Sequence, residues 1–344
     1  METTEKIGSN LGGHSVSLDR RICVAPMMDY TDRHCRYFLR LLTPSALLYT
    51  EMITATALLR GDAQRLLDFD AAEHPVALQL GGSDPRELAQ AARLGAERGY
   101  DEINLNCGCP SDRVKSGRFG ACLMAEPEQV AECVQAMREA ADVPVTVKCR
   151  IAIHPLPPGV EQEYQLLERF VTRVAAAGCR VFIVHARCAV LEGLSPKENR
   201  EIPPLQYPVV ARLQREFPHL SFVLNGGVRT GSEVRQHLEV FDGVMLGREA
   251  YHNPYLLAQL HRDVVDAAFR LPGREEVIGR YASYTHLRVA EGHRLRGVVR
   301  HVLGLYAGFP GVRSWRRFLL ERCNDPAANA DLLLDALRIV RSAA

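Results

Sequence analysis

The chain has 344 residues, of which 47% are hydrophobic and 24% are charged, and its formal net charge is +1. That length suits one large domain of barrel size and a smaller one, and no run approaches the ~18 apolar residues of a membrane span. We therefore expect an ordinary soluble globular protein with no membrane partner.

Residues 1–20 are polar and glycine-rich and are expected to form a flexible tail. They contain no apolar stretch, which argues against a secretory signal. The ten cysteines form no Cys-X-X-Cys pair and no second cluster with zinc spacing, so no metal site is expected. Unpatterned cysteines without a signal indicate the reducing cytoplasm.

Short apolar runs alternate with longer amphipathic stretches from residue 21 to about residue 250. This alternation predicts strand and helix units joined into a parallel sheet, with helices such as 85–98, 126–141, 164–177 and 231–240. Eight such units match a closed (β/α)8 TIM barrel of the α/β class better than an open sheet. The predicted strands are residues 22–25, 46–49, 76–80, 102–106, 143–149, 181–184, 222–225 and 243–246.

The barrel domain is predicted to cover residues 21–270, with a closing helix over 249–270. Residues 271–344 carry only helical periodicity and predict a small all-helical C-terminal domain. This segment holds 12 arginines against 7 acidic residues, whereas the rest of the chain is slightly acidic. The proline-rich residues 155–159 are expected to form a stiff loop after the fifth strand.

Chemically useful residues follow each predicted strand at its carboxyl end, which is where a barrel places its active site. The most informative is the turn at residues 106–111, where glycine and proline prevent continuation as strand or helix. This turn presents the Cys109 sulfur at the mouth of a site. The neighbouring Cys107 could also present a thiol there, and the alternative is that it is a small buried hydrophobic residue.

The seventh and eighth strands are followed by Asn225-Gly226-Gly227 and Gly247-Arg248, the usual place of a phosphate site in a barrel. Glycines let backbone N–H groups approach phosphate oxygens, and Arg248 offers a charged fork. The alternative for the two glycines is a simple tight turn.

Lys148 lies on an otherwise apolar strand, from which its ammonium would point into the barrel mouth. A Schiff-base lysine or a buried ion-paired lysine are alternatives. Its neighbours favour a cation beside the pyrimidine edge of a flavin, where the Gln79 amide can both donate and accept. His185 could reach the ring or the phosphate. No Gly-X-Gly-X-X-Gly follows any strand, so a nicotinamide cofactor would bind only transiently.

In these motifs the chain closely resembles the tRNA-dihydrouridine synthases, specifically their A-type subfamily. The resemblance covers roughly residues 20–325, and residues 109–114 are close to diagnostic. The matching segments are residues 25–32, 79–82, 108–114, 117–124, 147–150, 185–187, 225–227 and 246–248.

The resemblance implies an FMN enzyme that takes electrons from NADPH and reduces the C5=C6 bond of D-loop uridines 20 and 20a in tRNA. Hydride from flavin N5 would add at C6, and Cys109 would protonate C5, because an ordinary thiol is mostly protonated at neutral pH. FMN would be held by Pro26, Met27, Met28, Gln79, Lys148, His185, Asn225, Gly226, Gly227, Gly247 and Arg248.

The resemblance also assigns tRNA contacts to Lys197 and Arg200 after the sixth strand and to Arg313 and Arg316 in the helical domain. Asn106 would hold the uracil or the turn. The target base has to leave its loop for the pocket, and the unstacking is offset by contacts elsewhere. No stable protein partner is expected.

Two departures from the family pattern stand out: Cys107 replaces a small or aliphatic residue, and the loop from His154 to Gly159 is rich in proline. Two other functions remain open from the residues alone. One is a flavin barrel that acts on a free small molecule, such as a dihydroorotate dehydrogenase or an ene-reductase. The other is a tRNA-binding protein with a vestigial flavin site.

Overall fold

The structure is a computed structural model, and two predicted features lie partly or wholly outside the residues that it describes. The predicted tail lies outside them up to residue 17, and so does the predicted loop at residues 155–159. The described residues are 18–111, 114, 117–154 and 160–341.

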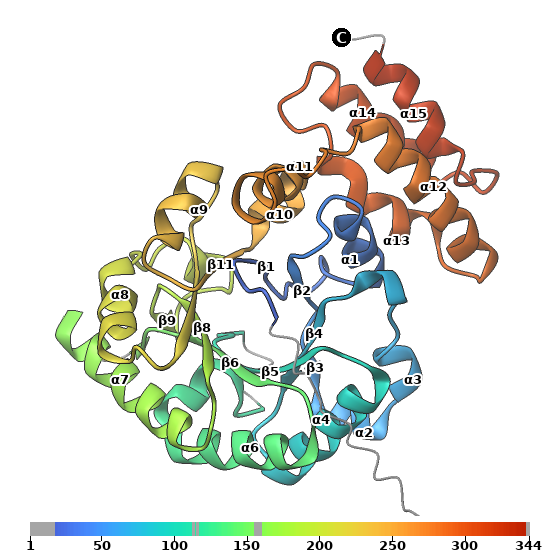
Figure 1. Cartoon of the computed structure of the whole chain (residues 1–344). Coiled ribbons are helices and arrows are strands. Elements are labelled where there is room, and N and C mark those ends of the chain that lie inside the picture. Colours follow the sequence, from blue (N-terminus) through green and yellow to red (C-terminus); the bar gives the residue numbers. More distant parts are fainter. Residues whose placement is uncertain (1–17, 112–113, 115–116, 155–159, 342–344) are drawn as a thin grey trace, which may run out of the picture.

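Eight parallel strands close into a barrel, seen in Figure 1 with its helices around it. Each strand hydrogen-bonds to a parallel neighbour on both sides, and the pairing of β2 with β4 completes the ring. The predicted TIM barrel is confirmed, and the predicted strand ends shift by no more than two residues. In ring order the strands are β1 (Ile22–Val24), β2 (Leu47–Tyr49), β4 (Val76–Gly81), β5 (Glu102–Cys107), β6 (Val145–Arg150), β8 (Val181–His185), β10 (Ser221–Asn225) and β11 (Gly243–Leu246).

Helices cover the outside of the barrel and begin where the sequence supplies caps. The Asp84 carboxylate accepts the N–H groups of Arg86 and Glu87, and Thr230 forms a capping box with Glu233. All four predicted helices are present. The helices of this part are α1 (Arg33–Arg40), α2 (Ala55–Arg60), α3 (Ala63–Leu66), α4 (Pro85–Arg98), α6 (Pro127–Ala140), α7 (Val160–Ala176), α8 (Tyr207–Glu216) and α9 (Gly231–Leu238), with short 3-10 turns η1 (Ala71–Glu73), η2 (Gly120–Ala125) and η3 (Glu198–Arg200).

The predicted single closing helix over residues 249–270 is wrong. Proline disfavours a helical residue before it, and Asn253, which precedes Pro254, adopts φ −137° and ψ 64°. The chain therefore forms separate helices and leaves helical geometry after Val265. They are α10 (Arg248–His252), α11 (Tyr255–Leu260) and the π-helical turn η4 (His261–Val265).

Three two-residue strands escaped prediction, because two residues are too few to show a period. Strand β3 (Ile53–Thr54) pairs with β4. Strands β7 (Ile153–His154) and β9 (Ala189–Val190) pair with each other beside the barrel mouth, in the loops after β6 and β8.

Side chains along β5 alternate between the barrel interior and the layer of helices outside it. Glu102 and Asn104 are fully buried, and both hydrogen-bond to Thr146 on the neighbouring strand β6. Ile103, Leu105 and Cys107 instead join the large apolar core between sheet and helices. The apolar part of the barrel interior consists of Cys23, Ala25, Leu47, Tyr49, Ala77, Ile183, Val223 and Met245.

The C-terminal segment is helical, as predicted. It packs against α1 (Figure 1). Tyr37 stacks on Tyr284 with ring centroids 3.8 Å apart, and Phe38 meets Tyr281 edge-on. One apolar core thus includes both parts of the chain, and the boundary after residue 270 stays a prediction. The helices are α12 (Arg274–Ala290), α13 (Leu295–Val299), the 3-10 turn η5 (Arg300–Gly304), α14 (Val312–Arg322) and α15 (Leu332–Arg341).

Within the described part of the chain, no helix combines the length and the apolar character that crossing a bilayer would require.

Asp32 joins the two parts by a polar contact. One carboxylate oxygen accepts the N–H of Cys35 and so caps α1, while the other accepts a hydrogen bond from Arg300 at 2.7 Å. The ring of His301 lies 3.0 Å from the same carboxylate. Burial alone would raise the pKa of Asp32, but the hydrogen bonds from His301, Cys35 and Arg300 outweigh it and hold the pKa well below its usual range.

Asp32→Asn keeps a good helix cap and removes the charge, so we expect it to lower the free energy of unfolding at pH 7 by about 2 kcal/mol. A lowered folded-state pKa means that this contribution is complete above the unfolded pKa of about 3.9 and fades as the pH falls below it. Urea unfolding of both proteins across this range measures the difference. Asp335→Asn, in an exposed pair with Arg338, is the control and should change stability by under about 0.5 kcal/mol.

A difference between wild type and Asp32→Asn that stayed constant as the pH fell would contradict the role of the Asp32 charge.

Candidate active site

The turn after β5 is held by the side chain of Asn106. Its Oδ1 accepts the backbone N–H groups of Gly108 at 3.1 Å and Cys109 at 3.0 Å, which is the geometry of an Asx turn. Its Nδ2 donates to Gln79 Oε1 at 2.8 Å. Asn106 therefore fixes the turn and orients a residue predicted to bind flavin.

The two thiols of this turn lie in different environments. Cys109 is partly exposed and its Sγ lies 3.5 Å from Ser111 Oγ, whereas Cys107 is fully buried in the outer core. Burial raises the pKa of Cys107 well above its usual value. Cys107 is thus the small buried hydrophobic residue that the sequence analysis gave as its alternative. Cys109 is the thiol at the barrel mouth.

Gly120 supports the turn from the other side. Its φ is +66°, and a side-chain carbon there would lie 2.6 Å from the Cys109 carbonyl oxygen. That carbonyl accepts the N–H of Ala121 at 2.9 Å. The glycine-rich segment at residues 117–120 is therefore needed for its close approach to the Cys109 main chain.

A buried carboxylate lies at the start of the same strand. Glu102 accepts hydrogen bonds from Tyr49 at 2.6 Å, Thr146 at 2.7 Å and Arg20 at 3.1 Å. These three donors, of which Arg20 also carries the opposite charge, satisfy a carboxylate that would otherwise be costly to bury.

Asn104 continues the polar contacts towards the turn. It donates to Thr146 Oγ1 and accepts from Gln79 Nε2, both at 2.8 Å, and Gln79 in turn accepts from Asn106. We call Glu102, Asn104, Gln79 and Asn106 the interior network. The sequence analysis missed Glu102 and Asn104, although the alternation Glu-Ile-Asn-Leu-Asn is a signal for a polar strand face.

Lys148 on β6 donates to Asn225 Oδ1 at 3.0 Å, which brings together two residues predicted to bind flavin. Asn225 is fixed by its own hydrogen bond to the Met245 carbonyl at 2.7 Å. Burial lowers the pKa of Lys148 to about 8, and the charge of Arg150 adds to this effect. The ammonium is mostly charged at pH 7 and would lose its proton about one unit higher.

His185 ends β8 and lies in register with Arg150 on one side and Asn225 on the other. Burial lowers its pKa well below the usual value, and the charges of Arg150 and Lys148 act in the same direction. The imidazole is therefore neutral at physiological pH.

Gly226 brings the main chain against this ring. Its φ is +114°, and a side-chain carbon there would lie 2.5 Å from His185 Cδ2. Gly227 has φ +76° and similarly little room beside Leu205. These glycines make more than a simple tight turn, because each is also required by a close contact.

Arg150 connects the cysteine turn to the loop after β8. Its guanidinium donates to the carbonyls of Gly108 at 3.2 Å, Cys188 at 3.2 Å and Asn199 at 2.9 Å. Burial lowers the pKa of Arg150 to about 10, which still leaves it charged. The sequence analysis included Arg150 only within the matching segment 147–150 and not among the site candidates.

Two arginines, Arg200 and Arg248, lie near each other at the edge of the barrel mouth. Arg248, at the start of α10, forms an ion pair with Glu201 at 2.7 Å. Arg200 is exposed next to it, where partial desolvation and then the charge of Arg248 lower its pKa. Lys197 is exposed on the same loop, at the start of η3.

The loop after β1 contributes the remaining predicted flavin residues. Pro26 and Met27 are partly buried, and the Met27 sulfur lies 4.0 Å from the position that a side-chain carbon at Gly247 would take. Met28 is 52% exposed. The backbone of Met27 is held by Thr31, whose hydroxyl accepts its N–H at 2.9 Å.

Arg313 and Arg316 are exposed on α14, which Figure 1 shows away from the barrel mouth. Trp315 between them is fully buried and anchors the helix, and Arg316 Nε donates to the Leu303 carbonyl at 3.0 Å. The structure therefore does not bring these two arginines to the other predicted site residues.

A family model described as dihydrouridine synthase (Dus) matches residues 23–341. The chain belongs to the dihydrouridine synthase family. Several relatives bear the name tRNA-dihydrouridine(20/20a) synthase, and three of them illustrate the similarity. The Pseudomonas putida protein is 54% identical over 93% of this chain and 94% of its own length. The Shewanella oneidensis protein is 51% identical over 95% of this chain and 96% of its own length. The Synechocystis protein is 54% identical over 92% of this chain and 93% of its own length. The resemblance noted from the motifs is confirmed.

The exposure of Cys109 and the burial of Cys107 predict that the two thiols differ in reactivity. Iodoacetamide should alkylate Cys109 in the native protein and leave Cys107 unmodified under the same conditions. Peptide mapping by tandem mass spectrometry distinguishes the two positions, and Cys122, which is also partly exposed, serves as a positive control. Equal modification of Cys107 and Cys109 would contradict the buried position of Cys107.

Proposed function

We propose that this protein reduces uridine to 5,6-dihydrouridine in tRNA, at positions 20 and 20a as the names of its relatives state. The observation that supports this best is the accessible Cys109, held on its Asx turn and joined to the polar strand ends of the barrel mouth. We further propose FMN as the bound cofactor, NADPH as its transient reductant and the cytoplasm as the place of action.

The donor set in the barrel mouth fits a flavin nucleotide. Lys148 and Gln79 offer a cation and an amide to the pyrimidine edge of the ring. The glycines after β10 bring the main chain close to His185 and Leu205, and Arg248 would offer a charge to a phosphate bound beside the ends of β10 and β11. When bound and reduced, the flavin supplies the hydride for uracil C6.

Cys109 is the proposed proton donor to uracil C5. A general acid must lie within reach of the carbon that it protonates, and the Asn106 and Gly120 contacts fix the Cys109 main chain at the mouth. Asn106 acts as the residue that positions this turn, since both of its side-chain atoms are already engaged there and with Gln79.

Lys148 and His185 define the electrostatics of the proposed ring site. The Lys148 ammonium would offer positive charge to a bound reduced ring, and the neutral His185 could donate one hydrogen bond and accept another. Pro26, Met27 and Met28, in the loop after β1, would border the proposed ring site.

The proposed tRNA contacts lie on two surfaces. Lys197 and Arg200 are exposed beside the barrel mouth, and Arg313 and Arg316 are exposed on α14. Cations on both would hold the phosphate backbone while the target base leaves its loop.

The test is to incubate the purified protein with NADPH and unmodified tRNA and to map dihydrouridine by its effect on reverse transcription. Product at position 20 or 20a is expected. Product elsewhere in the D-loop would keep the reaction and refute the positions. No product from flavin-loaded protein, repeated on tRNA that lacks only dihydrouridine, would overturn the proposal in favour of a small-molecule substrate or RNA binding alone.

In the same assay Cys109→Ala should lower dihydrouridine formation by about 100-fold or more, because a positioned acid typically contributes at least that much. The variant should still purify as a yellow flavoprotein. Cys107→Ala is the matched control and should stay active. Turnover by Cys109→Ala close to wild type would refute the assignment of the proton donor.

The double variant Arg313→Ala, Arg316→Ala should bind tRNA more weakly, and its plot of log affinity against log salt should flatten by about 1 to 2 in slope. Filter binding over a salt series measures this. Arg338→Ala on α15 removes an exposed arginine already paired with Asp335 and should leave the slope unchanged. An unchanged slope in the double variant would place the RNA surface elsewhere.

A further inference from the structure

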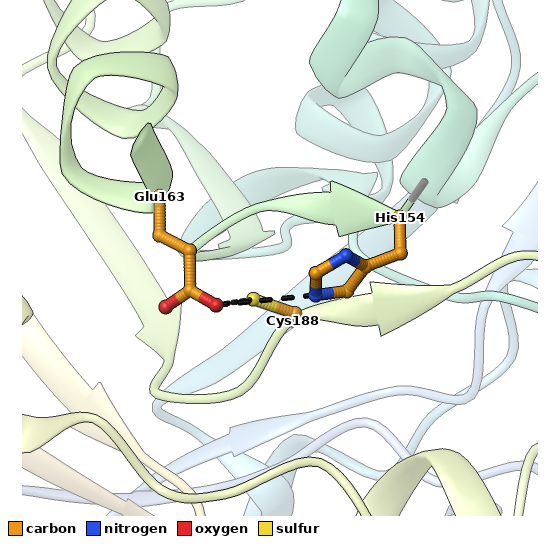
Figure 2. A group of neighbouring side chains, drawn as sticks. All are labelled: His154, Glu163 and Cys188. Atoms are coloured by element: carbon orange, nitrogen blue, oxygen red, sulfur yellow. Dashed lines mark hydrogen bonds and ion pairs between the residues drawn. The ribbon is translucent and has the colours of Figure 1, made fainter. Parts of the chain in front are cut away.

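Three potential metal ligands meet beside the barrel mouth, at residues that the proposed reaction does not use (Figure 2). His154 ends β7, Glu163 lies near the start of α7, and Cys188 directly precedes β9. The pairing of Ile153 with Ala189 aligns the two short strands and brings these distant parts of the sequence together.

The spacing of the three ligand atoms is close to that of a metal site. Cys188 Sγ lies 2.9 Å from Glu163 Oε1, His154 Nε2 lies 3.9 Å from the same oxygen, and all three atoms lie within 4.8 Å of one another. Zinc bonds of about 2.0 to 2.3 Å in a tetrahedron place ligand atoms roughly 3.3 to 3.8 Å apart. Shifts of about 1 Å or less would convert one arrangement into the other.

The carboxylate of Glu163 gives an independent indication. The residue is only 9% exposed, and among the described residues its Oε2 is buried without a hydrogen-bond partner. A buried carboxylate is normally paired with a cation or bound to a metal, because leaving it unsatisfied is costly. Among the described residues, the thiol of Cys188 is the only hydrogen-bond donor recorded to its other oxygen, and a thiol is a weak donor. His154 Nε2 is at ion-pair distance from this oxygen, 3.9 Å away.

We propose that His154, Glu163 and Cys188 bind one Zn²⁺ ion, with water as the fourth ligand. The donor set of imidazole nitrogen, carboxylate oxygen and thiolate sulfur is one that zinc accepts. His154 has a side-chain exposure of 31%, which leaves a side of the site open for water. Zinc would displace the thiol proton of Cys188 and release it to solvent.

The sequence prediction of no metal site relied on short Cys-X-X-Cys spacing. These three ligands lie 9 and 25 residues apart along the chain, so local spacing could not reveal them.

Such an ion would fasten the start of α7 to the loop after β8. The carbonyl of Cys188 already accepts a hydrogen bond from Arg150, which also contacts the cysteine turn through Gly108. The role is structural: the ion would support the segment from which Lys197 and Arg200 extend. This zinc proposal does not depend on the proposed function, because zinc binding can be measured without turnover.

The experiment uses the full-length protein, stripped with a chelator, dialysed and titrated with Zn²⁺. We expect one tightly bound equivalent by elemental analysis and a rise of several degrees in the melting temperature. Cobalt(II) in its place should give the visible bands of a tetrahedral site and a near-ultraviolet thiolate band. Cys188→Ser should lose the equivalent and the thiolate band.

Cys323→Ser is the matched control, since it removes a buried thiol of the apolar core that joins α1 and the C-terminal helices, which does not include this cluster, and it should keep the bound equivalent. Glu163→Gln provides a second variant in case Cys188→Ser fails to fold, which circular dichroism reports. Equal zinc content in wild type and both cluster variants, or no equivalent bound by the wild type, would overturn the proposal and leave only a thiol hydrogen-bonded to a carboxylate.

Discussion

The site depends on one set of hydrogen bonds, the interior network along β5. A strand whose inward face is Glu102, Asn104 and Asn106 places polar groups where a barrel usually packs branched apolar side chains. Each of these groups is satisfied by a neighbouring strand or by the turn, so the network orients the Gln79 amide and the Cys109 main chain together. A partly satisfied network would cost stability as well as position.

Much of the fold was predictable from the sequence, because most barrel strands are short apolar runs followed by an amphipathic helix. The eight strands and the helices between them follow that period, and so do the C-terminal helices. The closing helix was mispredicted although its sequence carries a local signal against it: Pro254 disfavours helical geometry at Asn253, where α10 ends. The two-residue strands β3, β7 and β9 were not predictable, since their pairing is decided by tertiary contacts.

The candidate site was predictable where a motif is local and polar. Cys109, Lys148, His185 and the glycines were found that way, and the structure brings their side chains or main chains to one mouth, while their roles stay predictions. Arg150 was underrated because its three acceptors are main-chain carbonyls, which no sequence pattern reveals. The cluster of His154, Glu163 and Cys188 was missed for a related reason, since three separate segments supply it.

The contact between Asp32 and the pair Arg300 and His301 has a consequence for selecting a nucleotide. The same carboxylate caps the first barrel helix and binds the turn on which α14 packs, so the distance from the barrel mouth to the α14 surface is set by packed, hydrogen-bonded parts. If RNA binds at α14 as proposed, only the nucleotide at the matching distance would reach the barrel mouth. Position along the RNA would then be chosen by length, without any reading of base sequence.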